Sequence, residues 1–264
     1  MPQPLEILKF LPKTNCKKCG YPSCLAFAFA LASGASEPSR CPELDPALFP
    51  SLAPEDKLPE EDYAWKVLEE VKKKALNVNW EEVAPNLGLK ALGPRELSIP
   101  YLDTVVLLRP DEAKREDGLP LDPRDQILLY NYVFFAGKAS LSGEFVGLET
   151  FPNSLSKVST LRRYAEEKLA RAFSGRLALL QKALQGFRYT LLPDSPGDLA
   201  VLVWVLPKVP LRIHFFEGEE EEGLEPEVKI LYDARATAYL DLESLVFCAE
   251  RLVERLMEKA GLEP

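Results

Sequence analysis

The chain has 264 residues, of which 47% are hydrophobic and 28% charged, and this length allows a small module followed by a medium-sized domain. Lys and Arg number 32 against 41 Asp and Glu, so the formal net charge is −9. General nucleic-acid binding needs a basic surface, and this class of function is therefore disfavoured. No run of about 18 apolar residues occurs, so no membrane span is predicted. The first residues do not form a secretory signal, and we expect a cytoplasmic protein.

Cysteines dominate the beginning of the chain. Four of the five lie within the first 41 residues, in the spacing C-x2-C-x4-C-x16-C, and these are Cys16, Cys19, Cys24 and Cys41. Disulfides are disfavoured in a reducing cytoplasm, so a tight group of cysteines indicates a metal site. Gly20 permits a left-handed backbone directly after the CxxC pair. Pro22 and Ser23 predict a helix start that places Cys24 in a first turn, where the helix dipole favours a thiolate.

The ligand spacing favours an iron–sulfur cluster over structural zinc. Zinc ribbons supply two close CxxC pairs, whereas here sixteen residues separate Cys24 from Cys41 and only four separate Cys19 from Cys24. Pro42 follows the last cysteine, as in many ferredoxin sequences. A structural zinc site remains the main alternative. Four unligated buried cysteines are a third interpretation, disfavoured because a module of about 45 residues without metal could hardly bury enough core to fold.

Residues 4–45 resemble a known family of small 4Fe-4S domains. Such a domain stands at the front of the large subunit of the corrinoid iron–sulfur protein and in the B subunit of the Rnf electron-transport complex. The resemblance rests on Leu11-Pro12, Asn15-Cys16, Cys19-Gly20, Cys24 with the helix CLAFAFALASG, and Cys41-Pro42. It implies that Cys16, Cys19, Cys24 and Cys41 together ligate one 4Fe-4S cluster.

The predicted domains are a cluster-binding module at residues 1–50, a linker at 51–60 with two prolines, and a larger domain at 61–264. Helical periodicity predicts helices at residues 61–76, 122–137, 160–173, 176–185 and 240–261. Runs rich in Val, Ile, Phe and Tyr predict one strand or a short hairpin arm at residues 96–110, and strands at residues 198–207, 211–218 and 227–234. Helices and strands segregate along the chain, so the predicted fold class is α+β, with an antiparallel sheet and packed helices in the larger domain.

The larger domain resembles the domain of unknown function 3786. The resemblance rests on QILLYNYVFFA, on SGEFVGLETFP, and on the stretch from LPKVPLRIHFFEG to ILYDARATAYLDLESL. It implies an architecture and no activity.

Several other residues invite a functional interpretation, and for each we expect a structural role. His214 is the single histidine and is predicted to be a satisfied strand residue, while Cys248 falls at helical spacing among leucines and is predicted to pack in the core. The glutamates at 217–227 predict a solvated hairpin loop. The glycines of 136–147 match no nucleotide-binding motif and predict a turn. The basic residues Lys157, Arg162, Arg163, Lys168 and Arg171 alternate with Glu166 and Glu167, which predicts a salt-bridged surface.

The sequence as a whole predicts an electron-transfer protein or subunit of anaerobic metabolism that passes electrons to a protein redox partner. Four cysteines fill every iron position, and no flavin, nucleotide or second cluster motif is present, so a carrier or accessory subunit is favoured over a stand-alone enzyme. Two alternatives stay open: a cluster-stabilised interaction or redox-sensing module, and an accessory protein of a corrinoid enzyme. Lys13, Lys17 and Lys18 crowd the first two ligands, where they either dock an acidic partner or balance the cluster's charge.

Overall fold

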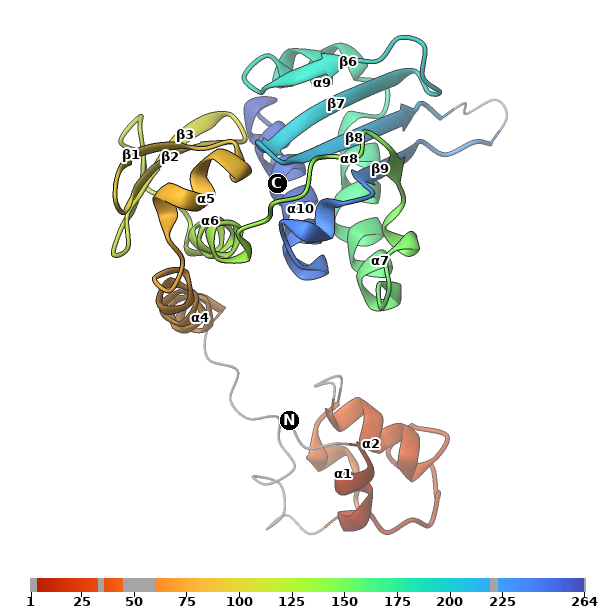
Figure 1. Ribbon diagram of the computed structural model, residues 1–264. Helices are drawn as coiled ribbons and strands as arrows, with labels where there is room; N and C mark the ends of the chain where they lie inside the picture. Colours follow the sequence, from red (N-terminus) through yellow and green to blue (C-terminus); the bar gives the residue numbers. More distant parts are fainter. Residues whose placement is uncertain (1–3, 33–35, 45–59, 219–222, 264) are drawn as a thin grey trace. The chain divides into compact units, whose positions relative to one another are not determined.

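The computed structural model describes residues 4–32, 36–44, 60–218 and 223–263. The chain divides into two compact units, Met1–Tyr63 and Ala64–Pro264 (Figure 1). The predicted linker at 51–60 lies outside the described residues except for Glu60, so the predicted domain boundaries stay predictions. None of the helices in the described ranges is both long and apolar enough to cross a membrane.

The first unit is built on two short packed helices, α1 (Pro4–Phe10) and α2 (Cys24–Ala32), with a single 3₁₀ turn η1 (Pro38–Arg40) after them. The hydroxyl of Ser23 accepts a hydrogen bond from the Ala26 N–H at 3.1 Å and so caps α2, which confirms the predicted helix start. Eight buried residues form the core of this unit: Ile7, Leu11, Cys24, Phe27, Ala28, Leu31, Cys41 and Leu44.

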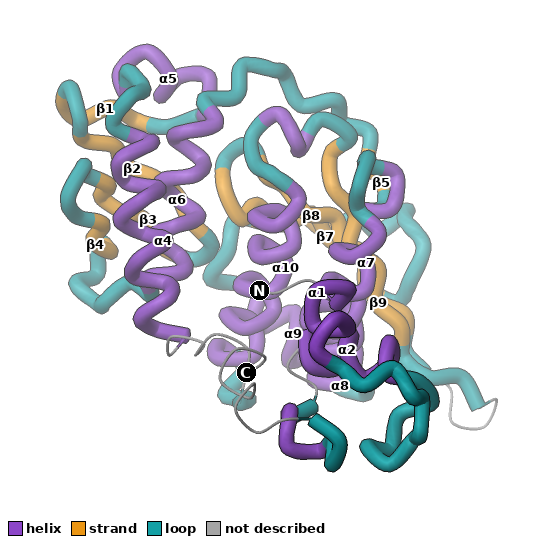
Figure 2. Tube along the Cα trace, turned by 90° about the horizontal axis from the view of Figure 1, so that it is seen from below, coloured by secondary structure: helices purple, strands orange, loops and turns teal. Residues whose placement is uncertain are grey.

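The second unit begins with two helices and a four-stranded sheet. The helices are α4 (Glu60–Ala75) and α5 (Trp80–Leu87), and the antiparallel sheet runs in chain order through β1 (Lys90–Gly93), β2 (Glu96–Tyr101), β3 (Thr104–Leu108) and β4 (Ala113–Arg115). Helices α5 and α6 (Pro123–Phe135) lie beside this sheet, and α4 runs alongside α6 (Figure 2). The run at 96–110, predicted as one strand or a short hairpin arm, holds both arms of a hairpin, because the chain turns at Leu102, whose φ is 52°.

The second unit also contains a five-stranded antiparallel sheet, in the order β5-β9-β8-β7-β6. Its strands are β5 (Phe145–Val146), β6 (Tyr189–Leu191), β7 (Leu199–Leu206), β8 (Val209–Phe216) and β9 (Glu227–Asp233). The three central strands confirm the three strands predicted at 198–234. Alternate residues of β7, from Leu199 to Val205, are buried on the face that meets the helices.

Helices cover one face of the five-stranded sheet (Figure 1). They include α7 (Leu155–Leu161), a π-helical turn (Arg162–Glu166) and α8 (Glu167–Phe173), which follow one another without a break, then α9 (Leu177–Leu184) and α10 (Leu242–Lys259). Short 3₁₀ turns η3 (Leu148–Thr150) and η6 (Ala236–Ala238) complete the unit. The α+β prediction is confirmed, although the single expected sheet is two sheets. A hydrogen bond of 2.9 Å from the Leu102 N–H to the Val205 carbonyl joins the two.

Candidate metal centre

The four predicted ligands all lie in the first unit. Cys16 is exposed and Cys19 half-buried on the loop between α1 and α2, Cys24 is the buried first residue of α2, and Cys41 is buried directly after η1. Cys24 and Cys41 belong to the same small core, and Cys19 packs against it. One loop, one helix start and one returning segment therefore supply the four thiols.

The backbone of the ligand loop is unusual. Three residues other than glycine have positive φ within five positions: Lys13 at 58°, Asn15 at 50° and Lys17 at 60°, followed by Gly20 at 85°. The left-handed conformation costs roughly 1–2 kcal/mol for a residue with a Cβ atom. Loops that alternate between right- and left-handed residues turn successive N–H groups toward one side, and such concavities bind anions, iron–sulfur clusters among them. The backbone thus fits a negatively charged metal–thiolate group.

A hydrogen bond attaches this loop to the start of α2. The side-chain oxygen of Asn15 accepts from the Cys24 N–H at 2.8 Å. This bond satisfies one of the N–H groups that a helix start leaves free and brings the residue before Cys16 next to Cys24. The CxxC pair is thereby held beside the positive end of the α2 dipole, which favours thiolates.

An ion pair attaches the same loop to the segment after Cys41. The Lys18 ammonium lies 2.6 Å from a carboxylate oxygen of Glu43. The hydrogen bond to Glu43 and its negative charge raise the pKa of Lys18, and Cys16 and Cys41 contribute in the same direction. The Lys18 N–H and the Thr14 hydroxyl lower the pKa of Cys16 by hydrogen bonding to its sulfur. Positive charge and donors therefore already surround the ligand positions.

Among the described residues, no three Cys, His, Asp or Glu side chains converge closely enough to hold a metal ion. The four cysteines thus lie in the same unit, but their sulfur atoms do not form a closed coordination site. The donor set itself is all thiol, the ligand type that selects zinc or iron–sulfur clusters over hard cations. The residues present fit such a group by donor chemistry, by the loop backbone and by local charge.

The remaining sequence candidates have structural roles. Cys248 is fully buried in the α10 core, where burial raises the pKa of its thiol. His214 is buried on β8, and its Nδ1 lies 2.8 Å from the Pro196 carbonyl, to which it donates. Both predictions are confirmed. The basic helical surface is salt-bridged at Glu167, which both Arg162 and Arg171 contact, whereas Glu166, predicted on the same surface, is buried and accepts a hydrogen bond from the Ile230 N–H.

The glycine-rich segment is the predicted turn. The buried carboxylate of Asp233 accepts hydrogen bonds from the backbone N–H groups of Ser142 (3.1 Å) and Gly143 (2.8 Å), and these bonds fix the loop against β9. The glutamate run falls partly outside the described residues, at 219–222. At its start, Glu217 accepts from the Gly175 N–H at 2.8 Å.

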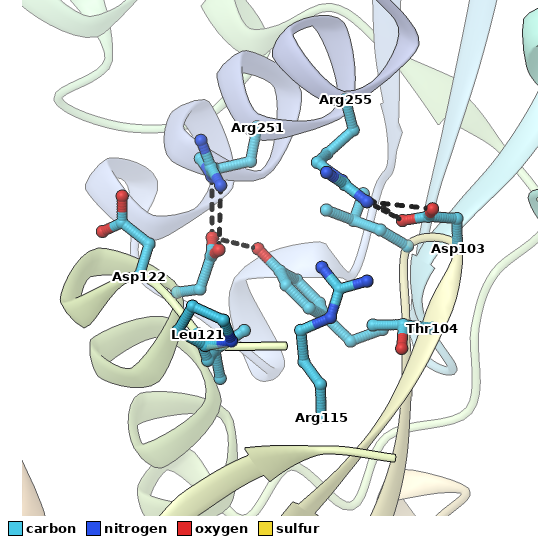
Figure 3. A pocket seen from close by; sticks show the side chains of 11 residues that line it. Asp103, Thr104, Arg115, Leu121, Asp122, Arg251 and Arg255 are labelled. Atoms are coloured by element: carbon cyan, nitrogen blue, oxygen red, sulfur yellow. Dashed lines mark hydrogen bonds and ion pairs between the residues drawn. The ribbon is translucent and has the colours of Figure 1, made fainter. Parts of the chain in front are cut away.

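Sequence reasoning missed a pocket in the second unit. Its volume is about 120 Å³, and Figure 3 shows side chains from the β2–β3 turn, β4, α6 and α10 around it. Arg251 binds Asp125 with two hydrogen bonds of 2.7 and 2.9 Å, and the Tyr101 hydroxyl donates to the same carboxylate at 2.7 Å. Burial, and then the charge of Asp125, raise the pKa of Tyr101 well above its usual range.

Every arginine of this pocket has its own aspartate. Arg255 contacts Asp103 at 3.0 Å, and Arg115 contacts the nearby Asp117 at 2.5 Å. The six ionisable lining residues, apart from Tyr101, are three arginines and three aspartates: Asp103, Arg115, Asp122, Asp125, Arg251 and Arg255. The charges that line the pocket balance, and its side chains bind one another. This arrangement indicates a structural role, in which ion pairs hold α10 against α6 and the β2–β3 turn. The one sequence signal was the spacing of Arg251 and Arg255, four residues apart on one face of α10.

Comparisons with known proteins match the two parts of the chain to different families. Residues 11–43 match a family model described as "Putative Fe-S cluster", and residues 79–255 match the domain of unknown function (DUF3786). Over 48 residues the chain is 56% identical to the corrinoid/iron-sulfur protein large subunit of Moorella thermoacetica, covering 18% of this chain and 11% of that protein. Over 45 residues it is 53% identical to the acetyl-CoA decarbonylase/synthase complex subunit gamma of Methanocaldococcus jannaschii, covering 17% of this chain and 9% of the relative.

The chain thus spans about a tenth of the length of these curated relatives, all of it in the first unit. No solved structure matches the chain significantly. The matches to the first unit support an iron–sulfur cofactor there, as the cysteine spacing predicts. The match to the second unit covers most of the chain, including every residue that lines the charged pocket. The chain therefore belongs to the DUF3786 family and carries an iron–sulfur region before the family's domain.

Proposed function

We propose that Cys16, Cys19, Cys24 and Cys41 hold one 4Fe-4S cluster and that the protein is an electron carrier or electron-transfer subunit serving a protein partner. The observation that carries the proposal is that one small unit collects the four thiols, two of them on a loop rich in left-handed residues. When bound, the cluster supplies a centre that takes up and gives back one electron.

Different residues of the first unit would contribute to binding the cluster in different ways. The four cysteines would supply thiolates, with Cys16 favoured as a thiolate by the Lys18 N–H and the Thr14 hydroxyl. The Asn15–Cys24 hydrogen bond would keep the CxxC loop at the start of α2. Burial of Cys24 and Cys41 would keep water from two of the four sulfurs. A dry, donor-rich surrounding is what tunes the potential of such a centre.

In a second candidate function, the protein is an accessory subunit of a corrinoid protein or of an acetyl-CoA decarbonylase/synthase complex. It is favoured by the names of the relatives, which are a corrinoid/iron-sulfur protein and a subunit of an acetyl-CoA decarbonylase/synthase complex. The likeness is confined to the first unit, so only the cluster module, and not the rest of those proteins, supports the idea. In either function the protein would work in the cytoplasm, where the unpaired thiols of all five cysteines persist.

Metal and sulfide analysis of the full-length protein, purified without oxygen, tests the proposal. We expect about four iron and four sulfide per chain, a brown colour, and reduction by dithionite. Cys41→Ala should lose or degrade the cluster, while the matched variant Cys248→Ala should keep its iron because Cys248 lies in the core of the other unit. About one zinc per chain without acid-labile sulfide would replace the proposal with a structural zinc site.

A further inference from the structure

Helix α2 exposes two apolar side chains, although most of the helix is buried in the core of the first unit. The helix contains no charged or amide side chain, and its Cys24, Phe27, Ala28 and Leu31 face the core. On the other side Leu25 and Phe29, one turn apart, are 40% and 57% exposed. A helix that is apolar on all sides is normally covered on all sides, and exposed apolar patches in small proteins mark interaction sites.

This face lies at the cluster end of the unit. Leu25 directly follows the ligand Cys24, and the Asn15–Cys24 hydrogen bond brings the ligand loop to the same end of the helix. Any protein seated on Leu25 is therefore also next to the proposed cluster. A surface that contacts a redox centre in this way suits electron transfer better than it suits a purely structural contact.

Two exposed lysines belong to the ligand loop, which the Asn15–Cys24 hydrogen bond attaches to the start of α2. Lys13 and Lys17 form no ion pair with another described residue, whereas Lys18, the third lysine of the predicted docking group, is paired with Glu43. The first fifty residues carry a formal charge of +1 and the remaining 214 carry −10, so positive charge is concentrated at the cluster end of an acidic chain. A second copy of this face would bring like charges together, which disfavours pairing between two copies.

We propose that Leu25 and Phe29, together with Lys13 and Lys17 of the ligand loop, form the docking surface for an electron-transfer protein with an apolar patch rimmed by carboxylates. The inference rests on the proposed function and adds to it the place and the chemistry of the partner. Complementary charge would raise the rate of encounter, and the apolar pair would form the desolvated centre of a small, short-lived interface.

Stopped-flow reduction of the full-length, cluster-loaded protein tests this surface, with a small acidic ferredoxin as the protein reductant and dithionite as the small-molecule reductant. For Leu25→Gln combined with Phe29→Gln, we expect the second-order rate with ferredoxin to fall about tenfold, as for loss of an interface centre. The rate with dithionite and the iron content should not change. Leu119→Gln, at an apolar residue of 58% exposure in the second unit, is the matched control and should leave both rates unchanged.

Lys13→Gln with Lys17→Gln should lower the ferredoxin rate at low salt and flatten its dependence on ionic strength. Equal ferredoxin rates in the Leu25/Phe29 variant and the unaltered protein, or no reaction of the unaltered protein with ferredoxin, would overturn the docking surface. A second unit that melts lower in the Leu25/Phe29 variant, or a dimer that this variant loses, would overturn it in favour of a covered structural face. If dithionite reduces neither the unaltered protein nor its variants, the proposed function is refuted instead.

Discussion

Lys18 and Glu43 form an ion pair, 2.6 Å from ammonium nitrogen to carboxylate oxygen, that joins the CxxC loop to the segment two residues beyond Cys41. The two side chains are 58% and 46% exposed, so the pair adds little to stability. Its importance lies in the placement of one positive and one negative charge next to the ligand positions. Of the three lysines predicted near the cluster, Lys18 is thus the one that balances charge inside the unit.

The reduction potential should follow these two charges in opposite directions. Lys18→Met removes a positive charge beside Cys16 and should lower the potential, because the added electron is then less well stabilised. Glu43→Gln removes a negative charge and should raise it, each shift being on the order of tens of millivolts. Lys66→Met, on the exposed face of α4, is the control. Redox titration followed by paramagnetic resonance measures the effect, and shifts of the same sign in both variants would disprove this account.

The buried pair Asp125–Arg251 should be far more sensitive to substitution than a surface pair. Arg251→Met leaves the Asp125 carboxylate buried with the Tyr101 hydroxyl as its remaining donor, and should cost about 3–5 kcal/mol of unfolding free energy. Arg162→Met, which breaks the exposed pair with Glu167, should cost less than about 1 kcal/mol. Urea unfolding followed by circular dichroism compares the two.

Replacing the whole buried group is the stricter test of that interpretation. The triple variant Asp125→Leu, Arg251→Met and Tyr101→Phe removes donors and acceptor together, so no buried polar atom of the group is left without a partner. We expect it to be more stable than Arg251→Met alone. A triple variant that is as unstable as the sum of its single changes would contradict the reasoning, since the cost would then come from lost packing.

Asp103 should contribute to acid unfolding of the second unit. Burial alone would raise the pKa of this carboxyl, but hydrogen bonds and charge from Lys259 and Arg255 outweigh burial and hold the pKa below its usual value. A carboxyl with a lowered folded-state pKa stabilises the fold above its unfolded value, near 3.9, and loses this contribution as pH falls through the folded value. Asp103→Asn should therefore flatten the loss of stability below about pH 4 in urea titrations.

Glu166 should show the opposite dependence. Its carboxylate accepts from the Ile230 N–H at 3.0 Å, yet burial dominates and raises its pKa. The folded state then binds a proton more readily than the unfolded state, so Glu166 weakens the fold more as pH rises above the unfolded value, near 4.3. The stability of Glu166→Gln relative to the unaltered protein should thus improve from pH 4 to pH 8. A pH-independent difference would show that the carboxylate pays no burial cost.

The sequence predicted the parts of this protein whose signals are local. The cysteine spacing lies within 26 consecutive residues, and the Ser23 helix start and the periodicity of helix α10 depend on residues within one or two turns of one another. The turn at Leu102 within the run 96–110 was not located because it contains neither glycine nor proline, although its backbone is left-handed. The short edge strands β5 and β6 carry too few residues for a period-2 pattern.

The charged pocket could not have been predicted because its contacts join distant positions. Asp125 and Arg251 are 126 residues apart in sequence, and Asp103 and Arg255 are 152 residues apart. Nothing in the local pattern around either aspartate distinguishes it from a solvated one. The ligand loop shows the same limit on a smaller scale, since positive φ at Lys13 and Lys17 follows from the path of the chain and not from the preference of lysine.

The hydrogen bond from Leu102 to Val205 bears on how the second unit folds. It joins the turn of the β2–β3 hairpin to the end of β7, so a backbone hydrogen bond connects the two sheets although about a hundred residues of chain separate its two ends. Closing so long a loop is slow, and neither sheet gains this contact until both have formed. We therefore expect the second unit to unfold in a single cooperative transition. We also expect that the four-stranded sheet, excised from the chain, does not fold independently.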